Sequence, residues 1–127
     1  MALGWALRLT GAVLLAAMAW IHVDLWRDGY RSIDVIGPGF LGNAVAGFLL
    51  AALLLVPVRG LLRWVALAGA LVAAGSLAAL VLSTTVGLFG FVESTAAPLW
   101  WETFWIEAAA IVVLAVLTVV ASRRRRT

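Results

Sequence analysis

Residues 61–85 read LLRWVALAGALVAAGSLAALVLSTT and contain one charged side chain, Arg63. A helix rises 1.5 Å per residue, so about 20 apolar residues cross the roughly 30 Å hydrocarbon core of a bilayer. Three further apolar stretches have comparable lengths, namely residues 3–23, 40–56 and 99–121. A segment inside lipid must satisfy its own backbone hydrogen bonds. The sequence therefore predicts four membrane-spanning helices.

The composition excludes an ordinary soluble domain. Of the 127 residues, 65% are hydrophobic and 12% are charged, whereas soluble domains have about 45–50% apolar and about 25% charged residues. The absence of cysteine excludes disulfides, iron–sulfur clusters, zinc–thiolate sites and thiol catalysis. We predict an all-α fold, an integral membrane four-helix bundle that forms a single membrane domain over residues 1–127.

The first apolar stretch has a second interpretation. Ala17-Met18-Ala19 resembles the small-residue cleavage site that follows the apolar run of a signal peptide. Arg8 within the run, and the continuation of the run to Val23, favour a membrane span instead. Cleavage would leave the topology of the other three spans unchanged.

The placement of arginine predicts the orientation in the membrane, because cytoplasmic loops carry the excess of basic residues. A cytoplasmic N-terminus puts seven arginines inside and only Arg27 and Arg31 outside. The seven are Arg8, Arg59, Arg63, Arg123, Arg124, Arg125 and Arg126. Both termini are then cytoplasmic, residues 24–39 and 86–98 form outer loops, and residues 122–127 form a basic cytoplasmic tail. We expect a multi-pass membrane protein.

Charged and aromatic residues flank the predicted spans. The predicted outer interface charges are Asp24, Arg27, Arg31, Glu93 and Glu102. The predicted membrane anchors are Trp26, Trp100, Trp101 and Trp105 on the outer side and Arg123, Arg124, Arg125 and Arg126 on the inner side. Because this basic block directly follows an apolar helix, the predicted partner is the lipid bilayer, and no nucleic acid is predicted.

Each predicted helix contributes polar side chains near the outer end of the bundle. The candidate ligand or proton site consists of His22, Asn43, Thr84 (followed by Thr85) and Glu107. Glu107 is the most informative, because an ionisable residue inside a span costs at least about 2–3 kcal/mol and marks a functional hypothesis. Its predicted partner is His22, or else Arg27 or Arg31. A structural pair is the favoured interpretation, and proton or ligand handling is the alternative.

Motifs of familiar enzymes are absent from the sequence. There is no glycine-rich phosphate loop with a lysine, no HExxH and no nucleophile elbow, so no catalytic residue is predicted. His22 could ligate a metal or a haem iron. A single histidine without cysteine cannot supply two axial ligands in one protomer. We therefore predict no cofactor and no metal.

Two features predict how the loops and helices pack. Trp26, Tyr30 and Ile33 recur at helical spacing, which predicts a short interfacial helix in the first outer loop. Residues 87–91 are too apolar for a free loop and are expected to dip into the headgroup region or pack on the bundle. Small residues repeat every four positions in the second and third spans, which favours close packing inside the bundle over a homodimer face.

Several short runs resemble a known group of proteins. They are HVDLW at 22–26, GYR at 29–31, IGP at 36–38, and GLFGF at 87–91 followed by Glu93. This pattern is similar to small four-span membrane proteins of actinobacteria that have no assigned activity. The resemblance implies a fold and a bacterial inner membrane. The likeness to DoxX-type four-helix proteins is one of architecture alone.

Small size and the lack of a catalytic motif favour an accessory or structural subunit. Its outer polar cluster would hold a partner, a lipid headgroup or a small ligand, within a larger membrane complex or a homo-oligomer. One alternative is an oligomeric proton-coupled transporter that uses Glu107. Another is a redox, metal- or haem-binding membrane protein that uses His22.

Overall fold

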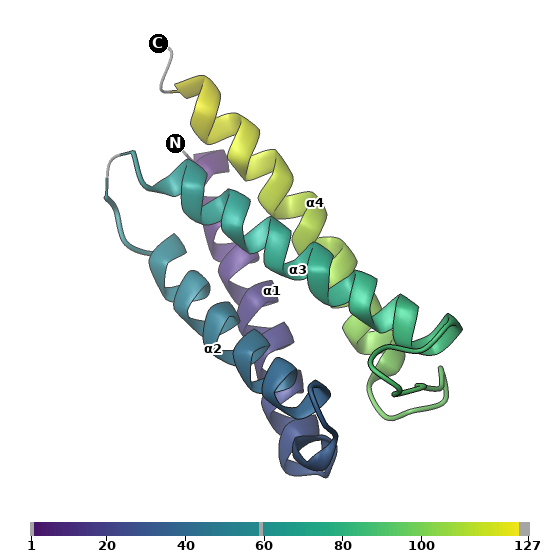
Figure 1. The fold of residues 1–127 in the computed structure, drawn as a ribbon. Coiled ribbons are helices and arrows are strands. Elements are labelled where there is room, and N and C mark those ends of the chain that lie inside the picture. The colour runs from purple at the N-terminus through teal and green to yellow at the C-terminus, as the bar shows by residue number, and fades with distance from the viewer. Residues whose placement is uncertain (1, 59, 125–127) are drawn as a thin grey trace.

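The computed structural model describes residues 2–58 and 60–124, and its described part is helical apart from loops (Figure 1). The elements are α1 (Ala2–Arg27), η1 (a 3-10 turn, Tyr30–Ser32), α2 (Ile36–Leu54), α3 (Leu62–Thr85) and α4 (Trp100–Arg124). All four α-helices are long and apolar enough to cross a membrane. The predicted all-α, four-helix architecture is confirmed. Arg59, Arg125 and Arg126, and the end of the predicted basic tail, lie outside the described residues.

The helix ends differ from the sequence-based expectation in the first outer loop. Helix α2 begins at Ile36, so Gly37-Pro38-Gly39 forms its first turn and does not precede it. Proline fits there because the first turn of a helix needs no N–H donor. In the loop for which a short interfacial helix was predicted, α1 continues to Arg27, and the single 3-10 turn η1 follows Gly29, whose φ of 140° redirects the chain.

The bundle consists of two helical hairpins, α1–α2 and α3–α4. Figure 1 shows the start of α1 and the end of α4 at one end of the molecule, with the hairpins diverging toward the other end. Between them lies a core whose fully buried side chains include Leu15, Leu54, Leu114 and Leu117. The divergence leaves the opposite end of the bundle more open.

Glycines allow the helices of the core to approach closely. A Cβ atom on Gly47 of α2 would lie 2.9 Å from the Cβ of Ala19 in α1. A Cβ atom on Gly11 of α1 would lie 2.7 Å from a methyl group of Leu114 in α4. Between helices in lipid there is no hydrophobic driving force, and small residues favour association because they allow close van der Waals packing of the backbones. The contact at Gly47, which belongs to the repeat of the second span, lies inside the bundle.

The outward faces of the helices are also apolar. Val13, Val45, Leu71 and Val112, one on each helix, are 62–66% exposed. A helix that is hydrophobic on all sides belongs in the interior of a large protein or in a membrane. In a chain of 127 residues the second setting fits, so the molecule has the build of a multi-pass membrane protein.

Candidate functional site: a cavity with a polar floor

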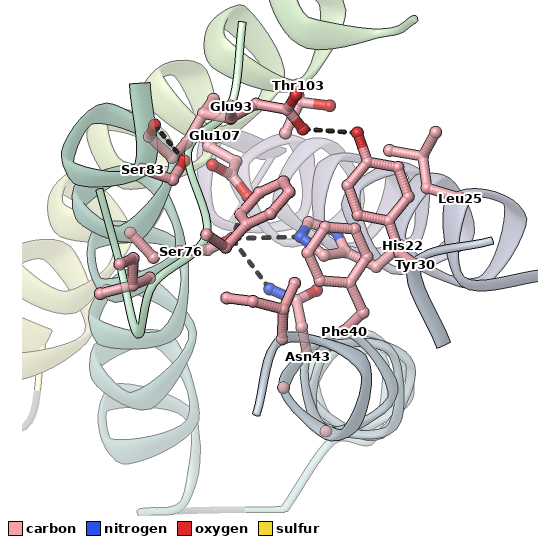
Figure 2. A pocket seen from close by; sticks show the side chains of 18 of the residues that line it. His22, Leu25, Tyr30, Phe40, Asn43, Ser76, Ser83, Glu93, Thr103 and Glu107 are labelled. Carbon is pink, nitrogen blue, oxygen red and sulfur yellow. Dashed lines mark hydrogen bonds between the residues drawn. The ribbon is translucent and has the colours of Figure 1, made fainter. Parts of the chain in front are cut away.

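A cavity of about 470 Å³ opens where the hairpins diverge. Residues of all four helices and of the loop between α3 and α4 line it, and Figure 2 shows it from close by. Its walls are mainly apolar and include the aromatic side chains Tyr30, Phe40, Phe89, Phe91 and Trp100. Both its volume and its lining match small-molecule sites, which span about 300–1,000 Å³.

The hydroxyl of Ser76 joins the four helices at the floor of this cavity. Ser76 Oγ donates a hydrogen bond to the carboxylate of Glu107 on α4. It accepts one from Asn43 Nδ2 on α2 at 3.0 Å, and it lies 3.5 Å from His22 Nε2 on α1 (Figure 2). One side chain of each helix therefore meets at a single oxygen atom of α3.

His22 is held in one orientation by its own helix. Its Nδ1 lies 2.8 Å from the carbonyl oxygen of Met18. A carbonyl only accepts, so Nδ1 carries the proton and Nε2 of the neutral ring is the acceptor that faces Ser76. The ring packs on Phe40 with centroids 4.8 Å apart. Within residues 2–58 and 60–124, no three His, Cys, Asp or Glu side chains group closely enough to hold a metal ion.

Two oxygen atoms at the floor have no hydrogen-bond partner. They are Glu107 Oε1 and Asn43 Oδ1, and both are buried. Glu107 itself is 0% exposed. Since Ser76 gives its only proton to Glu107, Asn43 must present its NH₂ group to Ser76, which leaves Oδ1 free. Both free atoms are acceptors, and leaving such an atom unpaired costs about 1–3 kcal/mol.

The structure brings together three of the four predicted site residues, His22, Asn43 and Glu107. Thr84 lies elsewhere: its hydroxyl donates to Leu80 O at 2.8 Å and accepts from Trp100 Nε1 at 3.0 Å. Thr85 bonds to carbonyls of its own helix and is exposed. The contribution of α3 is Ser76, about two turns further into the bundle. The sequence contains one feature that could have indicated Ser76: it is the single polar side chain between residues 65 and 82.

The partner of Glu107 also differs from the predicted partners His22, Arg27 and Arg31. Its hydrogen-bond partner is Ser76, and His22 is reached only through that hydroxyl. Arg27, at the end of α1, and Arg31, on η1, are exposed, as Glu102 is on α4, while Asp24 is half-buried.

A roof formed by the loop that contains η1 and the loop between α3 and α4 covers part of the cavity. The hydroxyl of Tyr30 donates to the carboxylate of Glu93, and the Tyr30 ring stacks on Phe40 with centroids 4.9 Å apart (Figure 2). The backbone N–H of Glu93 donates to Ser83 O at 2.8 Å, which attaches the second loop to α3. Burial and the neighbouring carboxylate raise the pKa of Tyr30. Glu93, predicted as an interface charge, therefore fastens the two loops together.

One predicted anchor is also part of the cavity wall. Trp100 is only 8% exposed and stacks on Phe104 with centroids 5.6 Å apart. It forms the start of α4, and its indole N–H bonds inward to Thr84, so it faces the bundle instead of lipid. Trp101 and Trp105 are exposed as an anchor requires, and Trp26 is half-buried.

Strained backbone surrounds the cavity. Among the described residues other than glycine, φ is positive at Val35 (65°), Phe89 (51°) and Leu99 (64°), and all three line the cavity. Val35 is the centre of a three-residue turn that the N–H of Ile36 closes onto Asp34 O at 2.7 Å. Such conformations cost about 1–3 kcal/mol each and gather at functional sites. The three positive φ angles at the rim of this cavity are therefore typical of a functional site.

Comparison with protein-family models, with curated proteins and with solved structures gives no match to this chain. The resemblance to actinobacterial four-span proteins stays a prediction.

Proposed function

We propose that this protein is a membrane receptor or accessory subunit that binds a small lipophilic molecule in the cavity of its outer half. The proposal includes a bilayer-spanning bundle with both termini in the cytoplasm. The observation that carries it is the pair of free buried acceptors, Glu107 Oε1 and Asn43 Oδ1, at the floor of an apolar cavity. A ligand with hydrogen-bond donors would pair both.

The head group of this ligand is a primary amine. A hydroxyl has one O–H and can serve only one of the two acceptors, whereas an ammonium group has three N–H donors. A positive charge also offsets the burial of the Glu107 carboxylate. Both free oxygens belong to groups that touch Ser76 Oγ, so they lie beside the same hydroxyl.

The body of the ligand is apolar and enters from the lipid between α2 and α3. Gly42 on α2 and Gly75 on α3 line the cavity and are exposed. A Cβ atom built on either would meet no atom within 4 Å. An amphipathic molecule dissolved in the bilayer can pass through this opening without crossing the polar roof.

Binding is a better fit to this geometry than transport by one protomer. Below the floor, the side chains of Leu15, Met18 and Leu114 are 0% exposed. A transport path would need polar groups that continue inward, and these side chains offer none. A cavity closed at its inner end retains its ligand.

The experiment uses the protein in phosphatidylcholine nanodiscs and three probes with one adamantane body: 1-adamantylamine, 1-adamantanol and 1-adamantanecarboxylic acid. Calorimetry, corrected with empty nanodiscs, gives each dissociation constant. The amine should bind at least about tenfold more tightly than the alcohol, because one further charge-assisted hydrogen bond contributes about 1.5–3 kcal/mol. The acid should bind weakest.

A matched pair of variants on α3 locates the binding. Gly75→Leu places a side chain in the cavity and should abolish binding of all three probes. Ala78→Leu adds the same kind of bulk at an exposed position of α3 outside the cavity and should leave binding unchanged. Equal affinity for all three probes, unaffected by Gly75→Leu, would contradict the proposal.

A further inference from the structure

A second cavity, of about 240 Å³, lies at the end of the bundle that carries the start of α1 and the end of α4. Three of its described lining residues are arginines, Arg8, Arg63 and Arg124, and none is acidic. The acidic residues lie on other parts of the chain: Asp24, Asp28, Asp34, Glu93, Glu102 and Glu107. Positive charge therefore gathers at this cavity, and no acidic side chain is among its described lining residues.

Arg8 is a fixed part of the cavity wall. It is 8% exposed, its Nε donates to Leu54 O at 2.6 Å, and its Nη2 donates to Val56 O at 2.9 Å. Its guanidinium also lies 4.1 Å from the ring centre of Trp5. These bonds use carbonyls at the C-terminal end of α2, and a guanidinium has five N–H donors, so further donors remain.

Arg124 reaches the same place from α4. A Cβ atom on Gly4 would lie 2.6 Å from Arg124 Nη1, so the guanidinium lies against α1 one turn before Arg8. Arg8 and Arg124 therefore bring two guanidinium groups to this cavity, one from α1 and one from α4.

Arg63 supplies a donor without a partner. Its Nε is buried and makes no hydrogen bond, and its guanidinium lies 4.9 Å from the ring centre of Trp64. It stands in the first turn of α3, where the helix dipole adds positive potential. A negatively charged acceptor in this cavity would pair this donor.

We propose that this cavity binds a phosphate group, carried either by an anionic phospholipid or by free phosphate. The planar guanidinium fork matches phosphate geometry and bonds it with two parallel hydrogen bonds. The exposed tryptophans Trp5 and Trp64 flank the site as they would at headgroup level. The inference does not depend on the function proposed for the first cavity.

The test measures lipid binding to the full chain in dodecyl maltoside by native mass spectrometry. Phosphatidylglycerol is compared with phosphatidylcholine, which has the same phosphate beside a cation. The wild type should bind one phosphatidylglycerol, and Arg63→Gln should weaken this binding about tenfold, as expected for one charge-assisted hydrogen bond. The control Arg31→Gln removes an equal charge at the opposite end and should change affinity less than about twofold.

Further measurements identify the source of the phosphate and distinguish lost binding from misfolding of a variant. Inorganic phosphate is titrated alone by calorimetry: binding indicates a free-phosphate site, and no binding beside tight phosphatidylglycerol indicates a lipid site. Arg124→Gln is a second variant expected to weaken binding, and circular dichroism checks that each variant is helical. Equal binding of the two lipids, or equal losses in Arg63→Gln and Arg31→Gln, would overturn the proposal.

Discussion

Ser76 is the residue on which the polar network depends, because its single hydroxyl contacts side chains from three other helices. It accepts from Asn43, donates to Glu107 and faces His22 Nε2. Each of these partners is a polar group inside an apolar bundle. Removing the hydroxyl would leave the side chains of Asn43 and Glu107 without this hydrogen bond.

Ser76→Ala should therefore lower the free energy of unfolding by about 1–3 kcal/mol. The control is Ser83→Ala on the same helix, since Ser83 is buried, whereas Ser76 is half-buried, and its hydroxyl bonds to Leu80 O, at 2.8 Å, in its own helix. This variant should lose less than about 1 kcal/mol. Unfolding with increasing SDS fraction in mixed micelles, followed by circular dichroism, measures both. Equal losses would show that the four-helix network adds no stability.

The sequence predicted His22, Asn43 and Glu107 because polar side chains stand out in long apolar runs. It could not choose between Ser76 and Thr84, since a hydroxyl in a helix can bond to the carbonyl one turn before it. Thr84 does so, with Leu80 O, whereas Ser76 bonds across the bundle. Which hydroxyl faces its neighbours depends on the tilt and rotation of packed helices, and one helix's sequence does not contain that information.

At the scale of elements, the roof consists of two loops that contact each other although they lie more than 50 residues apart in the chain. Its centre is the hydrogen bond from Tyr30 on η1 to Glu93, which follows the turn at residues 88–91. Tyr30 is the only tyrosine of the chain, so the absorbance of tyrosinate reports on this contact alone.

In an alkaline titration, Tyr30 should ionise above the ordinary tyrosine value of about 10, because burial and the Glu93 carboxylate raise its pKa. The stability that this raised pKa adds is complete below about pH 10 and is lost as the pH rises further. Glu93→Gln should lower the pKa of Tyr30, whereas Glu102→Gln, an exposed change on α4, should leave it unaltered. An equal pKa in wild type and Glu93→Gln would show that the roof is open in solution.

Helices were predictable from hydropathy, and loops were less so. All four spans followed from apolar length alone, because lipid leaves helix as the available form for these segments. The start of α2 was missed because Gly37-Pro38-Gly39 suits both a turn and a first helical turn. The roof was unpredictable, since Tyr30 and Glu93 meet only after the two hairpins have packed.

For the whole molecule, the central expectation is that the first cavity faces the outer leaflet. The second cavity, called the arginine cavity because Arg8, Arg63 and Arg124 line it, is expected to face the cytoplasm. The absence of cysteine allows single cysteines to be introduced without background. Thr95→Cys lies in the second outer loop and Val58→Cys lies between α2 and α3, and both positions are exposed. Intact cells treated with a membrane-impermeant maleimide should label Thr95→Cys, and Val58→Cys only after permeabilisation. The reverse pattern would place the first cavity on the cytoplasmic side.

The divergence of the hairpins is what gives this four-helix bundle its cavity. Tight contacts at Gly11 and Gly47 hold the core together, while Gly42 and Gly75 leave the opening between α2 and α3. The same residue type therefore closes one part of the bundle and opens another. Sequence repeats alone cannot distinguish these roles, because both depend on where the hairpins separate.

The most direct test of the account is native mass spectrometry of the protein extracted gently from its own membrane. The wild type should retain a reproducible small-molecule mass, which Ala78→Leu keeps and Gly75→Leu loses. A phospholipid at the arginine cavity would remain in all three, because neither change touches that site. If wild type and Gly75→Leu carry the same masses, the cavity above Ser76 holds no ligand and the proposed function is wrong.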